Sequence, residues 1–276
     1  MDEERAQAGI TDCHVHLLPG RLGEAVRAFF EQHITGTLAY PNDHRVVLDA
    51  LAASGVDRAW HLPYAHKPGV ADGLNRASAE LVETHRGHPV TLVGGATVHP
   101  GDDRPETLLR AAIDDHGLRV LKMHCSVGDH DVDDPRLDAV WRLVERRAVP
   151  AVVHAGRHVS GTTAADDLTG VDRVARRFPG APIVIAHAGH PATARALELV
   201  AAHDNVYIDL TPRVSDLVAI SDEDVERHRD RVLFGSDAPN TEVPLGQALA
   251  RLDGLSRATR DAVLHGNADR LLASVT

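Results

Sequence analysis

Eight short segments of almost purely aliphatic sequence recur along this chain of 276 residues, and each is followed by a stretch with a helical pattern. Strands that are apolar throughout are buried on both faces, as in a parallel sheet covered by helices. Eight such units in one unbroken series favour an α/β fold, a single (β/α)8 TIM barrel, over an open doubly wound sheet. We expect the strands at residues 10–16, 56–64, 89–100, 118–124, 150–156, 181–189, 205–210 and 231–239. No linker or low-complexity segment interrupts the series, so we expect one domain over residues 1–276.

Polar residues close nearly every one of these predicted strands. In TIM barrels the reactive groups lie at the C-terminal ends of the strands, so these residues are expected to meet at one mouth. His14 and His16, two apart on the first strand, would point to the same face and offer two imidazoles to a metal ion. Asp12 would lie behind them and orient one of the rings. The other strand ends carry His61, Tyr64, His99, Lys122, His124, His154, His187, Asp209 and Asp237.

Composition narrows the class of partner. A net charge of -11 argues against nucleic acid or an anionic membrane as the main partner, because both reward a basic face. Two cysteines give no disulfide framework, and the acidic N-terminus lacks the features of a signal peptide. No apolar run reaches membrane-spanning length. We therefore expect a cytoplasmic protein with a small-molecule substrate, and a homodimer as the commonest assembly.

Five motifs carry a resemblance to a known family. DCHVH, VVHAG, IAHAG, FGSDAP and HGNADRLL occur in this order along the chain. TVHPGDD, LKMH and DDPRLDAVW fit the same pattern. The sequence thus resembles the amidohydrolase superfamily and, within it, the amidohydrolase-related branch. That branch includes aminocarboxymuconate semialdehyde decarboxylase and resorcylate decarboxylases beside true hydrolases.

The resemblance implies a ligand set and two catalytic residues. His14, His16, His154 and Asp237 would bind one divalent metal, zinc in the first place, with manganese or iron as alternatives. His187 would contact the water on that metal, or the substrate. The metal lowers the pKa of its water toward about 7. Asp237 could then take the proton of this water, while His187 polarises the substrate carbonyl.

Four cationic or imidazole side chains are expected to bind the substrate. Lys122 and His124 lie at the end of strand four, Arg157 follows strand five and Arg213 follows strand seven. Together they would suit an anionic or carboxylate-bearing molecule. For each arginine a solvated surface position is an equal alternative. Lys122 has a second alternative. Some amidohydrolases carry a carboxylated lysine on this strand that bridges two metals, and His187 would then bind the second ion.

Two reactions fit this site. The first is metal-dependent hydrolysis of an amide, lactam or lactone of a small anionic molecule. The second is non-oxidative decarboxylation of an aromatic or unsaturated carboxylic acid. The chain carries Asp12 where resorcylate-type decarboxylases tend to have Glu, which favours hydrolysis. A barrel that only stores a metal and a TatD-like nuclease are further alternatives. The acid/base partners beside the metal residues argue against a barrel that only stores a metal. The negative net charge of the chain argues against a nuclease.

Overall fold

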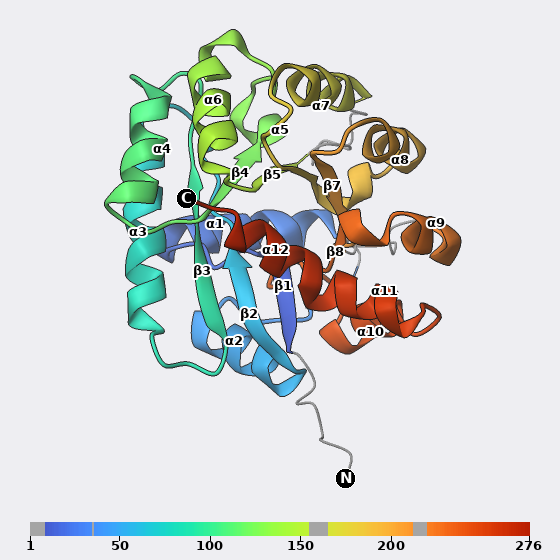
Figure 1. Cartoon of the computed structure of the whole chain (residues 1–276). Coiled ribbons are helices and arrows are strands. Elements are labelled where there is room, and N and C mark those ends of the chain that lie inside the picture. The colour runs from blue at the N-terminus through green and yellow to red at the C-terminus, as the bar shows by residue number, and fades with distance from the viewer. Residues whose placement is uncertain (1–8, 35, 155–164, 212–219) are drawn as a thin grey trace.

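Eight parallel strands form one sheet whose strands follow each other in chain order, which confirms the predicted (β/α)8 barrel (Figure 1). The computed structural model describes residues 9–34, 36–154, 165–211 and 220–276. The strands are β1 (Ile10–Val15), β2 (Val56–His61), β3 (Thr91–Thr97), β4 (Val120–His124), β5 (Ala151–His154), β6 (Ile183–Ile185), β7 (Val206–Asp209) and β8 (Val232–Leu233).

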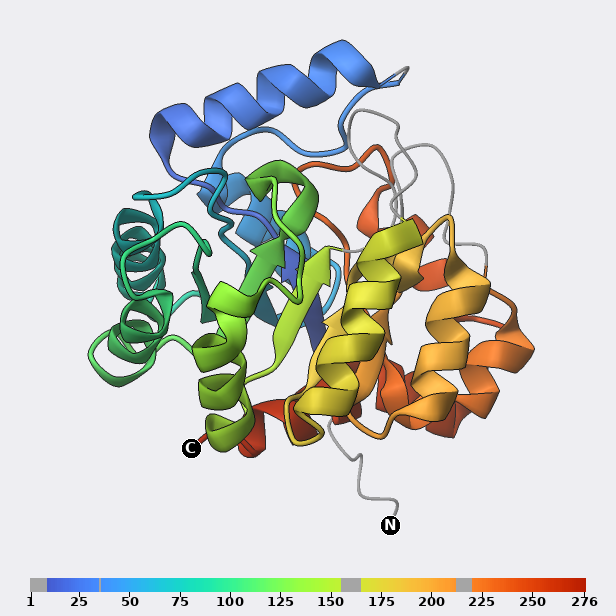
Figure 2. The same cartoon turned by 90° about the horizontal axis from the view of Figure 1, so that it is seen from above.

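Helices surround the strands (Figure 1). They are α1 (Gly20–His33), α2 (His44–Ala53), α3 (Ala71–Thr84), α4 (Pro105–Asp114), α5 (Cys125–Gly128), α6 (Asp138–Arg147), α7 (Ala165–Arg177), α8 (Thr193–Ala202), α9 (Asp222–Arg227), α10 (Leu245–Ala250), α11 (Arg257–Asp261) and α12 (Asn267–Ala273). Short 3₁₀ helices lie at η1 (Pro135–Leu137), η2 (Ala186–Gly189) and η3 (Arg229–Arg231), and a π-helix lies at η4 (Ala262–Gly266). Figure 2 shows α1 at one end of the barrel and the C-terminal helices at the other. No helix in the described ranges is long and apolar enough to cross a bilayer.

The core has two parts, one inside the barrel and one between the strands and the helices. Both consist mainly of Val, Leu, Ile and Ala, as a chain with 3% aromatic residues requires. Trp60 fills space inside the barrel and Trp141 lies in the outer part, and both are fully buried. This packing fixes the strands, and with them the positions of the polar side chains at their ends.

The last strand is much shorter than predicted, because β8 ends at Leu233 and the following residues form a loop. This loop still closes the barrel against β1. Cys13 N donates to Phe234 O at 2.8 Å, Asp237 N to His14 O at 2.8 Å, and His16 N to Ala238 O at 2.8 Å. Asp237 has a left-handed backbone (φ 63°), which a regular strand cannot contain.

The sixth strand also ends early. β6 stops at Ile185, and the predicted strand residues that follow form the turn η2. His187 and Ala188 have left-handed backbones, with φ of 55° and 46°. The imidazole of His187 is therefore placed by a turn and not by the pleat of a strand.

Acid should destabilise this fold through His61. Its side chain is 1% exposed, its Nδ1 accepts a hydrogen bond from Leu17 N at 3.2 Å, and burial lowers its pKa from 6.5 to about 3. The pKa of His61 in the folded protein lies below its pKa in the unfolded chain. The stability that neutral, buried His61 contributes is therefore fully present above pH 6.5 and is lost as the pH falls toward 3. We expect the free energy of unfolding to fall by about 2 kcal/mol through His61 when the pH is lowered from 7.5 to 5.

Urea unfolding at both pH values measures this loss. His61→Asn offers an acceptor near the position of Nδ1 without a proton-binding ring, so this variant should lose about 2 kcal/mol less than the parent on acidification. His33→Asn, at an exposed histidine, should leave the acid loss unchanged. An equal acid loss in His61→Asn and the parent would show that His61 is not the titrating group.

Candidate metal centre

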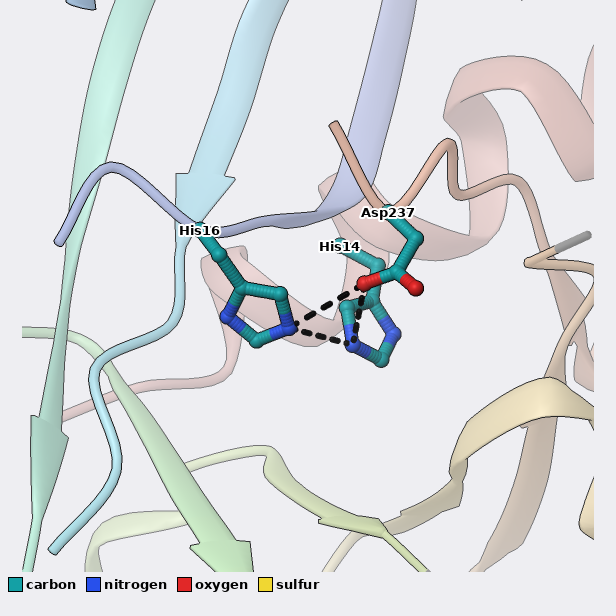
Figure 3. A group of neighbouring side chains, drawn as sticks. All are labelled: His14, His16 and Asp237. Atoms are coloured by element: carbon teal, nitrogen blue, oxygen red, sulfur yellow. Dashed lines mark hydrogen bonds and ion pairs between the residues drawn. The ribbon is translucent and has the colours of Figure 1, made fainter. Parts of the chain in front are cut away.

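Three candidate ligand atoms lie close together where β1 meets the loop after β8 (Figure 3). His14 Nε2 lies 3.2 Å from His16 Nε2, and Asp237 Oδ1 lies 3.2 Å from His16 Nε2 and 3.9 Å from His14 Nε2. Two ligands at about 2.1 Å from a tetrahedral zinc ion lie about 3.4 Å apart. The spacing and the two-imidazole, one-carboxylate donor set therefore fit one divalent ion. Among the residues that the structure describes, these three form the group suited to a metal.

Each histidine of this group is held through its other ring nitrogen. His16 Nδ1 lies 2.7 Å from the backbone oxygen of Leu62, which can only accept, so Nδ1 carries the hydrogen and Nε2 is left for the metal. His14 Nδ1 lies 2.9 Å from Asp209 Oδ2 and 3.1 Å from Thr211 Oγ1. Sequence analysis placed Asp209 at a strand end but gave it no role, because no local pattern indicates which ring it contacts.

Asp12 takes a different position from the one expected of a ring orienter. Its Oδ1 accepts hydrogen bonds from His14 N at 3.1 Å and from Ser236 N at 2.9 Å. Asp12 thus ties β1 to the loop after β8 through the backbone, and its side chain is fully buried. Burial raises its pKa to about 7.

The remaining predicted histidines line the same end of the barrel. The rings of His124 and His154 stack with centroids 3.9 Å apart, and the ring of His187 lies 4.9 Å from that of His154 and 5.0 Å from that of His14. His187 Nδ1 is buried and has no hydrogen-bond partner among the described residues. The structure thus brings His154 near the group, and its role as a fourth ligand stays a prediction.

Lys122 and Tyr64 complete this end of the barrel. Lys122 is fully buried, and its Nζ lies 3.2 Å from His14 Nε2. Burial lowers the pKa of Lys122 to about 8, while the negative charges of Asp209 and Asp237 act in the opposite direction and raise it. The ring of Tyr64 lies 5.4 Å from that of His16. Burial raises its pKa, so its hydroxyl stays protonated. Tyr64 was visible in the sequence only as a polar residue at a predicted strand end.

Burial also sets the charge of several side chains at this end of the barrel. It lowers the pKa of His14, His124 and His187 well below the ordinary value, so these imidazoles are neutral, the form that binds metals. Burial raises the pKa of Asp237, and its interaction with His16 opposes this shift. The predicted substrate residues Arg157 and Arg213 lie outside the described residues.

The fold and this site define a TIM-barrel protein with a candidate His-His-Asp metal centre at the mouth of the barrel. The sequence profile of the family described as "Amidohydrolase" matches residues 11–273. The chain therefore belongs to the amidohydrolase family, as its motifs predicted. This superfamily is metal-dependent. A search of curated proteins finds no match to the sequence.

Solved structures share the whole fold at low identity. An uncharacterised TIM-barrel protein from Bordetella bronchiseptica is 19% identical, with a TM-score of 0.76 over 96% of this chain and 98% of that one. 5-Carboxyvanillate decarboxylase from Sphingomonas paucimobilis is 17% identical, with a TM-score of 0.68 over 98% and 100%. Dihydroorotase from Campylobacter jejuni is 15% identical, with a TM-score of 0.62 over 95% and 82%. These likenesses show the fold and not the reaction.

Metal binding should stabilise the protein, because an ion that binds only the folded chain shifts the unfolding equilibrium. We expect Zn²⁺ at about 100 times its Kd to add about 2.7 kcal/mol to the chelator-treated protein. Thermal unfolding with and without Zn²⁺, together with the bound metal measured by elemental analysis, checks this. His16→Ala should lose most of the stabilisation. His99→Gln, at a buried histidine outside the three-residue group, should keep it. Full stabilisation of His16→Ala would contradict the site.

Proposed function

We propose that this protein is a metal-dependent hydrolase that cleaves an amide, lactam or lactone bond of a small anionic molecule. The observation that carries the proposal is the group of His14, His16 and Asp237, with His187 close by, whose Nδ1 has no hydrogen-bond partner in the part of the chain that the structure describes. We propose His154 as a fourth ligand and zinc as the metal. Family membership supports a metal at this position.

The side chains divide the chemistry between them. A bound divalent metal supplies the Lewis acidity that lowers the pKa of water toward about 7. Asp237 accepts the proton of the attacking water at a carboxylate oxygen, and burial makes this carboxylate a stronger base than an exposed aspartate. His187 donates a hydrogen bond from its ring to the substrate carbonyl oxygen, where negative charge develops.

The substrate class rests on charge. Lys122, with a pKa of about 8, is mostly protonated at neutral pH and would hold an anionic group of the substrate. His124 would border the same space, since its ring stacks on His154. Arg157 and Arg213 remain proposed substrate contacts. In the alternative, Lys122 is carboxylated and bridges the first metal to a second one.

Decarboxylation of an aromatic or unsaturated acid is the second candidate, and the comparisons support it equally, because the structural neighbours include decarboxylases by name. Asp12 Oδ1 accepts hydrogen bonds from two backbone N–H groups, and Asp12 does not belong to the three-residue group. Our preference for hydrolysis rests on the presence of Asp at position 12, where resorcylate-type decarboxylases tend to have Glu. One domain over residues 1–276, a cytoplasmic location and a homodimer also remain proposals.

A substrate panel separates the two reactions. Cyclic amides, lactones and linear amides of small carboxylic acids should be hydrolysed, and carbon dioxide should not be released from aromatic acids. Product analysis by mass spectrometry and a coupled carbon dioxide assay measure both on the same metal-loaded preparation. Carbon dioxide release without any hydrolytic turnover would replace the first candidate with the second.

The general base can be tested separately. Asp237→Asn keeps the size of the side chain but lowers its basicity, so kcat should fall by about 10²- to 10⁴-fold while much of the metal stays bound. Asp103→Asn, at a side chain that is 94% exposed, is the matched control and should be as active as the parent. Turnover by Asp237→Asn at the parental rate, with metal bound, would remove Asp237 from the reaction.

A further inference from the structure

Asp209, the last residue of β7, contacts two of the site histidines at once. Its Oδ2 lies 2.9 Å from His14 Nδ1, and its Oδ1 accepts hydrogen bonds from His187 N at 2.9 Å and Thr211 N at 3.0 Å. The Thr211 hydroxyl also donates to Oδ1. The carboxylate is fully buried, and both of its oxygens are used. Asp209 therefore joins a candidate ligand from β1 to the turn that follows β6.

The contacts of His14 define which of its nitrogens carries the hydrogen. A lysine ammonium can only donate, so Lys122 Nζ at 3.2 Å requires His14 Nε2 to be the acceptor. In a neutral imidazole the other nitrogen then carries the hydrogen, and Nδ1 faces a carboxylate, which accepts it. The two contacts agree on one tautomer. That tautomer leaves His14 Nε2 without a hydrogen and able to bind a metal, at 3.2 Å from His16 Nε2 and 3.9 Å from Asp237 Oδ1.

The contact with His187 serves the second histidine. The left-handed backbone of this residue is uncommon for any residue other than glycine. A hydrogen bond from its N–H to a buried carboxylate is charge-assisted, and it stabilises the turn that aims the imidazole at the site. One carboxylate thus orients a ring directly and another ring through its backbone.

We propose that Asp209 is a positioning residue that holds His14 as the Nδ1–H tautomer for metal binding and fixes the turn that carries His187. The inference rests on the proposed metal site of the previous section. Carboxylates that hold ligand histidines commonly change metal affinity by about 10- to 100-fold when they are mutated.

Asp209→Asn tests the proposal with almost no change of shape. Its carbonyl oxygen can still accept from His187 N, but its amide nitrogen then faces His14 Nδ1 and can only donate. His14 Nδ1 must become the acceptor, and the hydrogen moves to Nε2, where it blocks the metal. We expect metal affinity, measured by competition with a chromophoric chelator, to fall about 10- to 100-fold. Circular dichroism should show an unchanged fold.

The tautomer itself supplies a readout that does not need metal or activity. In ¹⁵N NMR of the metal-free protein, the His14 signals, assigned by their loss in His14→Gln, should show Nδ1–H in the parent and Nε2–H in Asp209→Asn. Thr211→Val is the control, since it removes the neighbouring hydroxyl and leaves the carboxylate. It should keep the Nδ1–H tautomer and an affinity close to that of the parent.

The outcomes separate this inference from the proposed function. An Nε2–H tautomer in the parent, or Asp209→Asn with parental metal affinity, would overturn the role of Asp209. A loss of affinity in Asp209→Asn without a change of tautomer would also overturn it, because the effect would then be structural. A parent that binds no Zn²⁺ while showing the Nδ1–H pattern would refute the proposed metal-dependent function and leave the tautomer assignment standing.

Discussion

The candidate site depends on the backbone seam between β1 and the loop after β8. Hydrogen bonds from Cys13, His16 and Asp237 close the barrel at this seam. The same bonds place the two histidines of β1 beside a carboxylate that is more than 200 residues away in sequence. Gly235 makes the close approach possible, because a Cβ at this position would lie 2.8 Å from the Cβ of His14. Closing the barrel and assembling the site are therefore one structural event.

The site also depends on the aliphatic interior beneath it. Valine and leucine side chains fill the barrel below the polar residues and keep water out of its lower part. Above them, Lys122, Asp209 and Asp237 are charged groups that a dry interior tolerates only when they have partners. Imidazole rings lie against Lys122 and Asp237, and backbone N–H groups donate to Asp209. The low polarity that makes this arrangement costly is also what strengthens the electrostatic interactions on which metal binding and catalysis rely.

Membership of the amidohydrolase family establishes a scaffold and a type of site, and the reaction is decided by side chains above that site. Neighbours of nearly the same shape include a decarboxylase and a dihydroorotase by name. Beside the candidate ligands this chain carries a buried lysine, Lys122, whose Nζ lies 3.2 Å from His14 Nε2, and Tyr64, whose ring stands edge-on to that of His16.

The sequence alone was sufficient for the barrel, the order of the strands and the end of the barrel at which the site lies. The reason is that aliphatic strands buried on both faces and polar residues at their ends are local patterns, readable one segment at a time. Only the tertiary structure decided the details. The four residues of β1 from Asp12 to Val15 lie opposite three residues of β2, Ala59 to His61. In addition, β8 stops after Leu233, and His187 lies on a left-handed turn. The contact of Asp209 with His14 joins residues 195 positions apart in the sequence, and such contacts arise only when the barrel closes.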